Sequence, residues 1–388
     1  MQKRTIPFAA MGGVYDAEDV AAATRVTEGA CGAGGSFFPL PEENDFQNAL
    51  AEHEGAEHAV AVNSCGTALD LCMMALGIGP GDEVITTPLT FVCTAGTAIG
   101  QGAKVVFADI DPITMNLDPV SVRERVTEKT KAVIPVHFAG LAADIDAFDA
   151  ITAESGVPVI YDAAHAVGTK YKDKAIGGAG KASCYSFQSN KNMTCLGEGG
   201  AVTSNDADFA EVVRQKKTFG YVYGARIRVV SIGFNYRMTK PQYAVGLTQL
   251  KKIDRVIAAR QESMMAMNDL LAGVDEIILP AGHGPGHGSH LYIIRVDTDK
   301  VAFSRDTFSA HLKDAYGVAT AMHYPAVWSW EAFSELGYSE ATANCPIAAA
   351  ACSQVVSLPI IPSTSPEDLE YIAWAIKQTV ADLNKGTP

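Results

Sequence analysis

A carboxylate and an amine stand just past the ends of two hydrophobic segments. Residues 157–161, Val-Pro-Val-Ile-Tyr, fit a buried strand that ends at Asp162. Residues 183–187 fit another strand, and Lys191 follows it on a turn that leads into the glycine-rich residues 196–200. A buried carboxylate is costly unless it is paired, and a lysine becomes nucleophilic when burial lowers its pKa. Taken alone, Asp162 also fits a cap and Lys191 a solvated surface charge.

Together, the two residues match the requirements of one cofactor. Pyridoxal phosphate (PLP) forms a Schiff base with a lysine, and an acid pairs with its pyridinium nitrogen. In open parallel sheets, ligands bind beyond the carboxyl ends of the strands. Because Asp162 and Lys191 both follow strand ends, we expect them to share a cleft that holds PLP.

A phosphate group would suit residues 63–68, Asn-Ser-Cys-Gly-Thr-Ala, which join a strand to a helix. Free N–H groups at a helix start, together with Gly66 and the hydroxyl of Thr67, favour an anion. Ser186 could add a hydroxyl to the same phosphate. An ordinary helix cap and a plain strand-end serine remain alternative interpretations.

Aromatic and imidazole rings near these positions invite two further interpretations. Phe91 could stack on a flat cofactor ring and His165 could cover a ring face, although each also fits a structural role. His283, His287 and His290 share one glycine-rich loop and could bind a metal ion. Without nearby cysteine or acid ligands, the pattern favours a solvated hairpin loop instead.

The elements that position these residues alternate between strand-like and helix-like segments from about residue 59 to residue 205. Such alternation is typical of an α/β unit with a mostly parallel sheet covered by helices. The expected strands are 59–62, 83–86, 104–108, 132–136, 157–161, 183–187 and 201–203. The expected helices between them are 67–76, 90–99, 119–126 and 145–154.

The pattern changes after Thr239. An apolar stripe predicts one long helix over residues 239–266. Later segments predict strands at 276–279 and 291–296 and helices at 303–316 and 367–383. We expect a large domain over residues 1–250, with an N-terminal arm packed on it, and a small C-terminal domain over residues 251–388.

The composition of the 388 residues limits the classes of function. A formal net charge of −14 argues against nucleic-acid binding and fits small ligands. Hydrophobic residues make up 48%, enough for a large core, yet no run reaches the length of a membrane span. The eight cysteines are scattered without paired spacing, which predicts free thiols in a reducing, cytoplasmic compartment.

Several motifs in order along nearly the whole chain resemble the DegT/StrS-type sugar aminotransferases, a family of PLP fold type I. The matching pieces are Ser-Cys-Gly-Thr-Ala at 64–68, Gly-Asp-Glu-Val-Ile at 81–85, Thr-Phe-Val at 90–92, Pro-Val-His at 135–137, Asp-Ala-Ala-His at 162–165, Ser-Phe at 186–187, Lys-Asn at 191–192, Gly-Glu-Gly-Gly at 197–200, Asn-Tyr-Arg-Met at 235–238 and His-Tyr-Pro at 323–325. The resemblance implies an aspartate aminotransferase-like α/β fold. Its large domain would hold a mostly parallel seven-stranded sheet, and its smaller C-terminal domain would be α+β.

The resemblance also implies roles for the matching residues. Lys191 would carry the cofactor and move the proton, and Asp162 would pair with the pyridine nitrogen. Phe91 and His165 would flank the ring, and Gly66, Thr67 and Ser186 would bind the phosphate. Asn235 would reach the phosphate from the partner subunit of a homodimer. Family members move an amino group from glutamate or glutamine to a keto sugar, often nucleotide-linked, or to a keto cyclitol, in amino-sugar pathways to antibiotics or polysaccharides.

Two other functions stay open from the sequence. A relative with the same fold and cofactor could dehydrate or aromatise a cyclitol-like ring without transferring an amine. One dehydratase branch replaces the lysine with histidine, so the presence of Lys191 disfavours that branch. A function of another class would be a metal-binding or sensory module built on the loop with His283, His287 and His290.

Overall fold

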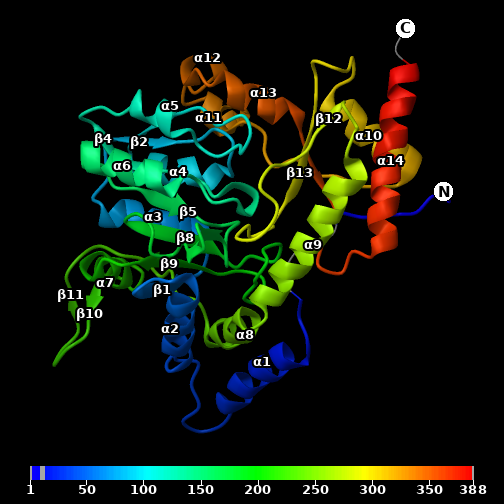
Figure 1. Cartoon of the computed structure of the whole chain (residues 1–388). Helices are drawn as coiled ribbons and strands as arrows, with labels where there is room; N and C mark the ends of the chain where they lie inside the picture. Colours follow the sequence, from blue (N-terminus) through cyan, green and yellow to red (C-terminus); the bar gives the residue numbers. More distant parts are fainter. Residues whose placement is uncertain (1, 9–13, 387–388) are drawn as a thin grey trace.

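The computed structural model describes residues 2–8 and 14–386. Two groups of strands make up the layer that the helices cover (Figure 1). One group has the order β1-β9-β8-β5, and the other has the order β3-β2-β4. The bounds are β1 (His58–Val62), β2 (Glu83–Thr86), β3 (Lys104–Phe107), β4 (Thr130–Ile134), β5 (Ile160–Asp162), β8 (Ala182–Ser186) and β9 (Gly200–Ser204).

Most of these strand pairs are parallel, as the sequence predicts. β2 runs parallel to β3 and β4, β5 runs parallel to β8, and only β9 pairs antiparallel with its neighbours β1 and β8. The isolated parallel bridges Val133↔Val159 and Val136↔Asp162 connect the two groups between β4 and β5. The structure therefore divides the strands between two sheets joined by bridges, and a continuous seven-stranded sheet stays a prediction.

The helices between the strands agree with the predicted segments to within a few residues. The helix after β1 begins at Cys65 because the Ser64 side chain accepts a hydrogen bond from the Thr67 N–H, which forms a capping box. The helices of this part are α1 (Ala17–Gly29), α2 (Glu42–Glu54), α3 (Cys65–Ala75), α4 (Val92–Gly100), α5 (Pro119–Arg123), α6 (Ile145–Ser155) and α7 (Ala207–Lys216). Short antiparallel pairs follow β5 and α7, namely β6 (Lys170–Tyr171) with β7 (Lys174–Ala175) and β10 (Tyr221–Val222) with β11 (Arg228–Val229).

The prediction of one long helix over residues 239–266 is wrong. The structure has α8 (Lys240–Leu250) and α9 (Ile253–Leu271), separated at Lys251 and Lys252. The apolar stripe continues across the break, so periodicity does not reveal it. At the break, the Lys252 ammonium pairs with Asp19 of α1 and with Asp16, the N-cap residue of α1, as described below. α8 packs against α1 and α2, whereas α9 runs on to lie beside α14 (Pro366–Lys385) (Figure 1).

The C-terminal part combines a small antiparallel sheet with helices. Its strand order is β12-β13-β14, and the sheet packs with α9, α10 and α14 around a core that includes Met264, Tyr292 and Ile376. The elements are β12 (Ile277–Ile278), β13 (Tyr292–Val296), α10 (Arg305–Tyr316), α11 (Glu331–Ser334), α12 (Glu340–Ala343), α13 (Pro346–Gln354) and β14 (Val355–Leu358). The division near residue 250 into two domains falls beside the break between α8 and α9 and stays a prediction.

Only a part of the N-terminal arm packs on the first part of the chain, as the sequence suggested. Residues 2–8 lie on the C-terminal part, where Ile6 bridges Val318 and Arg4 pairs with Asp368 at 2.5 Å. α1 alone lies against α8 of the first part. Extended backbone at Ile6 satisfies its hydrogen bonds by joining the chain at Val318, and no local sequence signal reports such a distant partner. Across residues 2–8 and 14–386, no helix is both long and apolar enough to cross a membrane.

A buried ion pair fixes α1 against the break between α8 and α9. Lys252 Nζ lies 2.6 Å from Asp19 Oδ2 and 2.8 Å from Asp16 Oδ1, and Asp19 is only 2% exposed. Burial acts to raise the pKa of Asp19, but hydrogen bonds from Lys252, Thr248 and its other donors hold it below the ordinary value of 3.8. Removing the cation would leave a buried carboxylate uncompensated.

We expect Lys252→Met to lower the free energy of unfolding by about 3–5 kcal/mol at neutral pH, measured by urea denaturation. Since the folded-state pKa of Asp19 is depressed, its stabilising effect is present above pH 4 and is lost as the pH falls through the folded pKa. The difference from the wild type should therefore shrink in acid. The exposed neighbour Lys251→Met is the control, and an equal loss in both variants would refute the role of the pair.

Candidate active site

A cavity of about 460 Å³ opens where β5 and β8 end, beside the start of α3. Segments from distant parts of the sequence form its wall, including the turn after β8 and residues 323–324, which follow the bridge between Ala321 and β14. Six of the eight predicted site residues line this cavity: Gly66, Phe91, Asp162, His165, Ser186 and Lys191. The cleft expected from the two strand ends is thus present in the structure.

The other two predicted site residues lie elsewhere. The Thr67 hydroxyl lies 2.7 Å from Asn63 Oδ1 and 3.2 Å from the backbone N–H of Ser64, so it serves the start of α3 rather than the cavity wall. Asn235 is exposed, and its backbone bridges Thr218. Within one subunit, therefore, Asn235 is not brought to the cavity.

Asp162 is held at the end of β5 with its carboxylate almost fully buried (3% exposed). Its Oδ2 accepts a hydrogen bond from Thr94 Oγ1 at 2.7 Å, and its Oδ1 accepts one from the Ala164 N–H at 3.1 Å. Burial raises the pKa of Asp162, and these two donors offset part of the rise. The carboxylate has no ion pair with another side chain in the part of the chain that the structure describes.

Lys191 stands on a tight turn after β8. Its backbone N–H donates to the Gln188 carbonyl at 2.9 Å, and the Ser189 N–H donates to the Gly197 carbonyl at 3.0 Å. The turn needs positive φ at Leu196 (57°) and Gly197 (105°), the second of which glycine adopts without strain. Burial lowers the pKa of Lys191, while the nearby thiols and Asp162 oppose that shift. A lysine with a lowered pKa has a larger fraction of nucleophilic amine.

His165 covers one side of the cavity and is neutral. Its Nδ1 accepts a hydrogen bond from the Ala139 N–H at 3.3 Å, so its proton sits on Nε2, which lies 3.1 Å from the Tyr324 hydroxyl. Burial lowers the pKa of His165 well below its ordinary value, and the charge of Lys191 acts in the same direction. Phe91 is 55% exposed, and its ring centroid lies 6.1 Å from that of Tyr324.

The residues present fit pyridoxal phosphate. Asp162 is a buried carboxylate whose hydrogen-bond donors are all neutral, which is the environment that a protonated pyridine nitrogen would complete. Lys191 borders the same cavity, and so do Ser64 and Gly66 at the N-terminus of α3, where the helix dipole favours an anion such as a phosphate.

Several side chains on or behind the cavity wall were given no individual role from the sequence. Thr94 looks like an ordinary helix residue, and only the packing of α4 brings its hydroxyl to Asp162. Tyr324 lies far along the chain, so no local spacing connects it with His165. Other residues on the wall to which the sequence pattern assigned no individual role are Cys65, Thr90, Cys93, Val136, Ala164, Gln188, Asn190, Glu198 and His323.

The expectation of a solvated histidine loop is wrong. His287 and His290 are 3% and 2% exposed, because the loop backbone bonds to the first part of the chain, for example from the Gly288 N–H to the Gly140 carbonyl. The His283 and His287 rings lie 4.5 Å apart, whereas His290 lies against His165. Over residues 2–8 and 14–386, no three His, Cys, Asp or Glu side chains are grouped so as to hold a metal ion. This arrangement does not support the metal-binding or sensory module.

Comparisons with known proteins agree with this site. The model of the DegT/DnrJ/EryC1/StrS aminotransferase family matches residues 17–377. The spore coat polysaccharide biosynthesis protein SpsC of Bacillus subtilis is 40% identical over 352 residues, which cover 88% of this chain and 90% of SpsC. S. venezuelae DesV, solved in complex with a ketimine intermediate, is 32% identical with a TM-score of 0.85, over 93% of this chain and 94% of DesV. 3-Amino-5-hydroxybenzoic acid (AHBA) synthase is 32% identical with a TM-score of 0.88, over 98% and 100% of the two chains.

Proposed function

The chain belongs to the DegT/DnrJ/EryC1/StrS aminotransferase family, and from this premise we propose that it moves an amino group from glutamate or glutamine to a nucleotide-linked keto sugar or a keto cyclitol. Membership confirms the type I fold, the dependence on pyridoxal phosphate and the transaminase chemistry that the sequence predicted. It also confirms sugar transamination as the main interpretation of the sequence. The donor, the nucleotide link and the individual residue roles belong to the proposal.

The observation that carries the proposal is the meeting of Asp162 and Lys191 in one cavity of about 460 Å³. Pyridoxal phosphate, when bound, supplies an electron sink that carries the amino group between two half-reactions. In this proposal, Asp162 holds the ring nitrogen protonated and Lys191 Nζ moves the proton as general base and then as general acid. The lowered pKa of Lys191 suits that exchange, since the amine must both accept and return a proton near neutral pH.

The remaining cavity residues would bind and orient. In this proposal, His165 and Phe91, which both line the cavity, cover the two faces of a flat ring, and neutral His165 donates only from Nε2. Gly66 and Ser186 would hold the phosphate at the start of α3, with Thr67 shaping that helix start through its bonds to Ser64. Removing any of these should weaken binding of the cofactor more than it changes the proton transfer.

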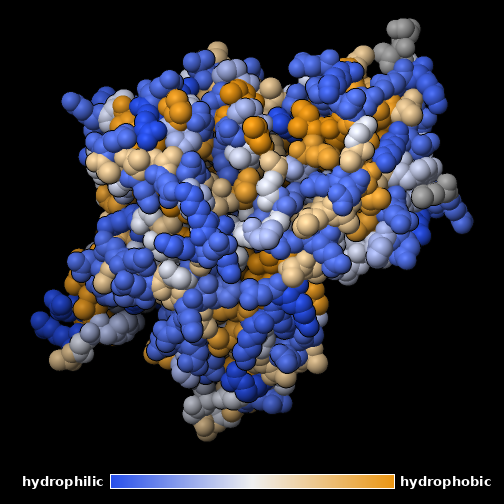
Figure 2. Space-filling model, viewed as in Figure 1, coloured by the Kyte–Doolittle hydropathy of each residue, from blue (hydrophilic) through white to orange (hydrophobic). Residues whose placement is uncertain are grey.

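We also propose a homodimer, with Asn235 reaching the phosphate in the partner subunit. The backbone of Asn235 bridges Thr218, and these two residues flank the segment that forms the β10–β11 hairpin. The hairpin projects from the body of the molecule (Figures 1 and 2). Large apolar side chains on and beside this hairpin are exposed to water, a pattern typical of a protein interface. They are Tyr223 (65%), Ile227 (57%), Val229 (65%), Val230 (47%), Ile232 (76%) and Phe234 (45%).

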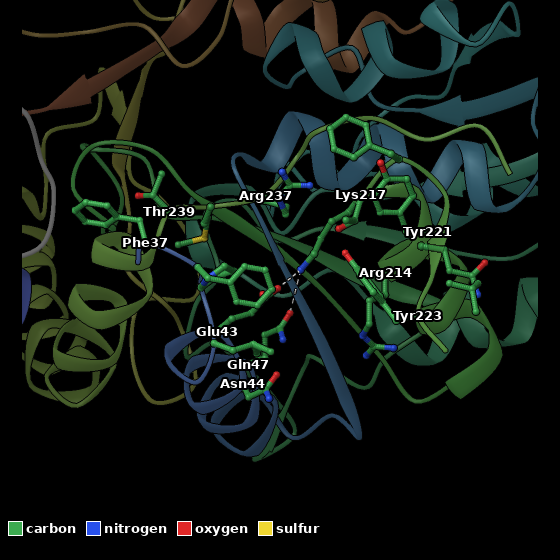
Figure 3. Close-up of a pocket in the computed structure, with 18 of the residues that line it drawn as sticks. Phe37, Glu43, Asn44, Gln47, Arg214, Lys217, Tyr221, Tyr223, Arg237 and Thr239 are labelled. Carbon is green, nitrogen blue, oxygen red and sulfur yellow. Dashed lines mark hydrogen bonds and ion pairs between the residues drawn. The ribbon is translucent and has the colours of Figure 1, made fainter. Parts of the chain in front are cut away.

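A second cavity of about 970 Å³ lies at the base of the same hairpin, between α2, α7 and residues 37–40 (Figure 3). Lys217 lies buried in it, pairs with Glu43 and donates to the Ala61 carbonyl at 3.0 Å. The Lys217 carbonyl in turn accepts from the Tyr236 N–H at 3.1 Å, which fixes the backbone beside Asn235. Phe37 and Phe38 on its rim are 55% and 62% exposed, so a second copy of the chain covering this face would bury them.

The cytoplasm is the compartment that we propose for this dimer. All eight cysteines are free, and six of them are buried. Free buried thiols without disulfides are usual in a reducing compartment.

Lys191→Ala tests the transaminase chemistry. We expect the visible absorbance that the bound cofactor owes to its link with lysine to be lost, and kcat for amine formation from a keto sugar and glutamate to fall by about 10⁴-fold. Lys170→Ala, at an exposed lysine outside the cavity, serves as the control. Turnover of Lys191→Ala at more than a tenth of the wild-type rate would contradict the proposal. A dehydrated or aromatised product from the wild type, without amine formation, would favour the non-transaminating alternative.

Mixing two inactive variants tests whether Asn235 acts across the subunit boundary. In the proposed dimer, each active site takes Lys191 from one subunit and Asn235 from the other. Lys191→Ala and Asn235→Ala therefore remove different residues of the same site. After subunit exchange in an equal mixture, half of the dimers are hybrids with one intact site, so about a quarter of the wild-type activity should return. No recovery in a mixture that demonstrably exchanges subunits would mean that Asn235 serves its own subunit or no site at all.

A further inference from the structure

His290 ends the glycine- and histidine-rich loop that precedes β13, and its ring is buried. The His290 N–H donates to the Ala139 carbonyl at 3.0 Å, and the His290 carbonyl accepts from Arg260 Nη1 at 3.3 Å. The ring Nδ1 lies 3.3 Å from Oδ1 of Asn192, the residue next to Lys191. A residue of the C-terminal part thus touches the neighbour of the reactive lysine.

The directions of these hydrogen bonds are fixed by what each group can do. Asn192 Nδ2 lies 2.6 Å from the Gly288 carbonyl, which can only accept, so the amide nitrogen faces Gly288. The amide oxygen then faces His290 and can also only accept. His290 must therefore carry its proton on Nδ1, and burial, which lowers its pKa well below the ordinary value, keeps the ring neutral.

His290 also packs against the histidine of the cavity wall. The two ring centroids of His290 and His165 lie 4.6 Å apart. Ala139 joins them, because its N–H donates to His165 Nδ1 and its carbonyl accepts from the His290 N–H. Two charged imidazoles this close to each other and to Lys191 would repel, so both rings function in their neutral forms.

We propose that His290 and Asn192 are positioning residues that hold the backbone at Lys191 and so fix where its Nζ enters the cavity. Neither side chain lines the cavity, so both act through Lys191 and His165 rather than on substrate. The pair also ties the C-terminal part of the chain to the turn that carries the lysine. The inference rests on the proposed role of Lys191.

Variants of the holoenzyme at His290 test the pair. His290→Ala removes the hydrogen-bond donor to Asn192. His290→Asn places an amide N–H near the position of Nδ1 and so keeps that hydrogen bond. His283→Gln is the matched control, since His283 shares the loop but has no hydrogen bond to Asn192. We expect kcat of His290→Ala to fall by about 10- to 100-fold with little change in either KM, because misplacement of a reacting group affects the chemical step.

A spectroscopic signature separates positioning from general loss of structure. The pH midpoint of the bound cofactor's visible absorbance reports the environment of the lysine, and it should shift in His290→Ala, return in His290→Asn and stay unchanged in His283→Gln. Asn192→Ala should shift it in the same way, and the double variant should be no worse than either single variant. Asn192→Ala also keeps the test available if His290→Ala does not fold.

Three results would overturn the inference. His290→Ala could match His283→Gln in kcat and in the pH midpoint, or His290→Asn could be as impaired in kcat as His290→Ala at equal Tm. The third is that the effects of His290→Ala and Asn192→Ala add in the double variant. Lys191→Ala serves as the reference in the same series. If Lys191→Ala is inactive while His290→Ala behaves normally, only the positioning role fails. If Lys191→Ala turns over, the proposed function itself fails.

Discussion

The carboxylate of Asp162 sits at the end of a buried strand, where water cannot solvate its charge. Hydrogen bonds from Thr94 and the Ala164 N–H ease that cost, yet burial still raises its pKa. A protonated ring nitrogen would favour the ionised form of Asp162 and would keep the cofactor electron-poor. The surrounding elements bring other groups to Asp162. The packing of α4 places the Thr94 hydroxyl on its carboxylate, and the parallel pairing of β5 with β8 puts Lys191 at the same edge of the sheet.

The site is built from residues that are far apart in the sequence. The start of α3 supplies Gly66, the end of β5 supplies Asp162, and Tyr324 enters from the C-terminal part to meet His165. Such a site is only as precise as the packing between those parts. Buried polar contacts supply that precision at the break between α8 and α9, where Lys252 holds α1, and in the contact between His290 and Asn192.

The sequence predicted the part of this arrangement that depends on local pattern and on the parallel sheet. Asp162 and Lys191 could be paired from the sequence alone because carboxyl ends of parallel strands meet at one edge. Thr94 and Tyr324 could not, since a threonine in a helix and a tyrosine in a loop carry no local sign of their distant partners. The break at Lys252 was missed because the apolar stripe continues through it and periodicity does not reveal it. The prediction of a solvated histidine loop was wrong because it rested on the polar composition of the loop. Hydrogen bonds to distant parts of the chain bury the loop instead.

The central claim is that Asp162 keeps the pyridine nitrogen protonated. The most direct measurement is the ¹⁵N chemical shift of that nitrogen in the enzyme loaded with ¹⁵N-labelled pyridoxal phosphate, compared between the wild type and Asp162→Asn. We predict a protonated nitrogen at neutral pH in the wild type and an unprotonated one in Asp162→Asn. An unprotonated nitrogen in the wild type, or the same shift in both proteins, would contradict the account.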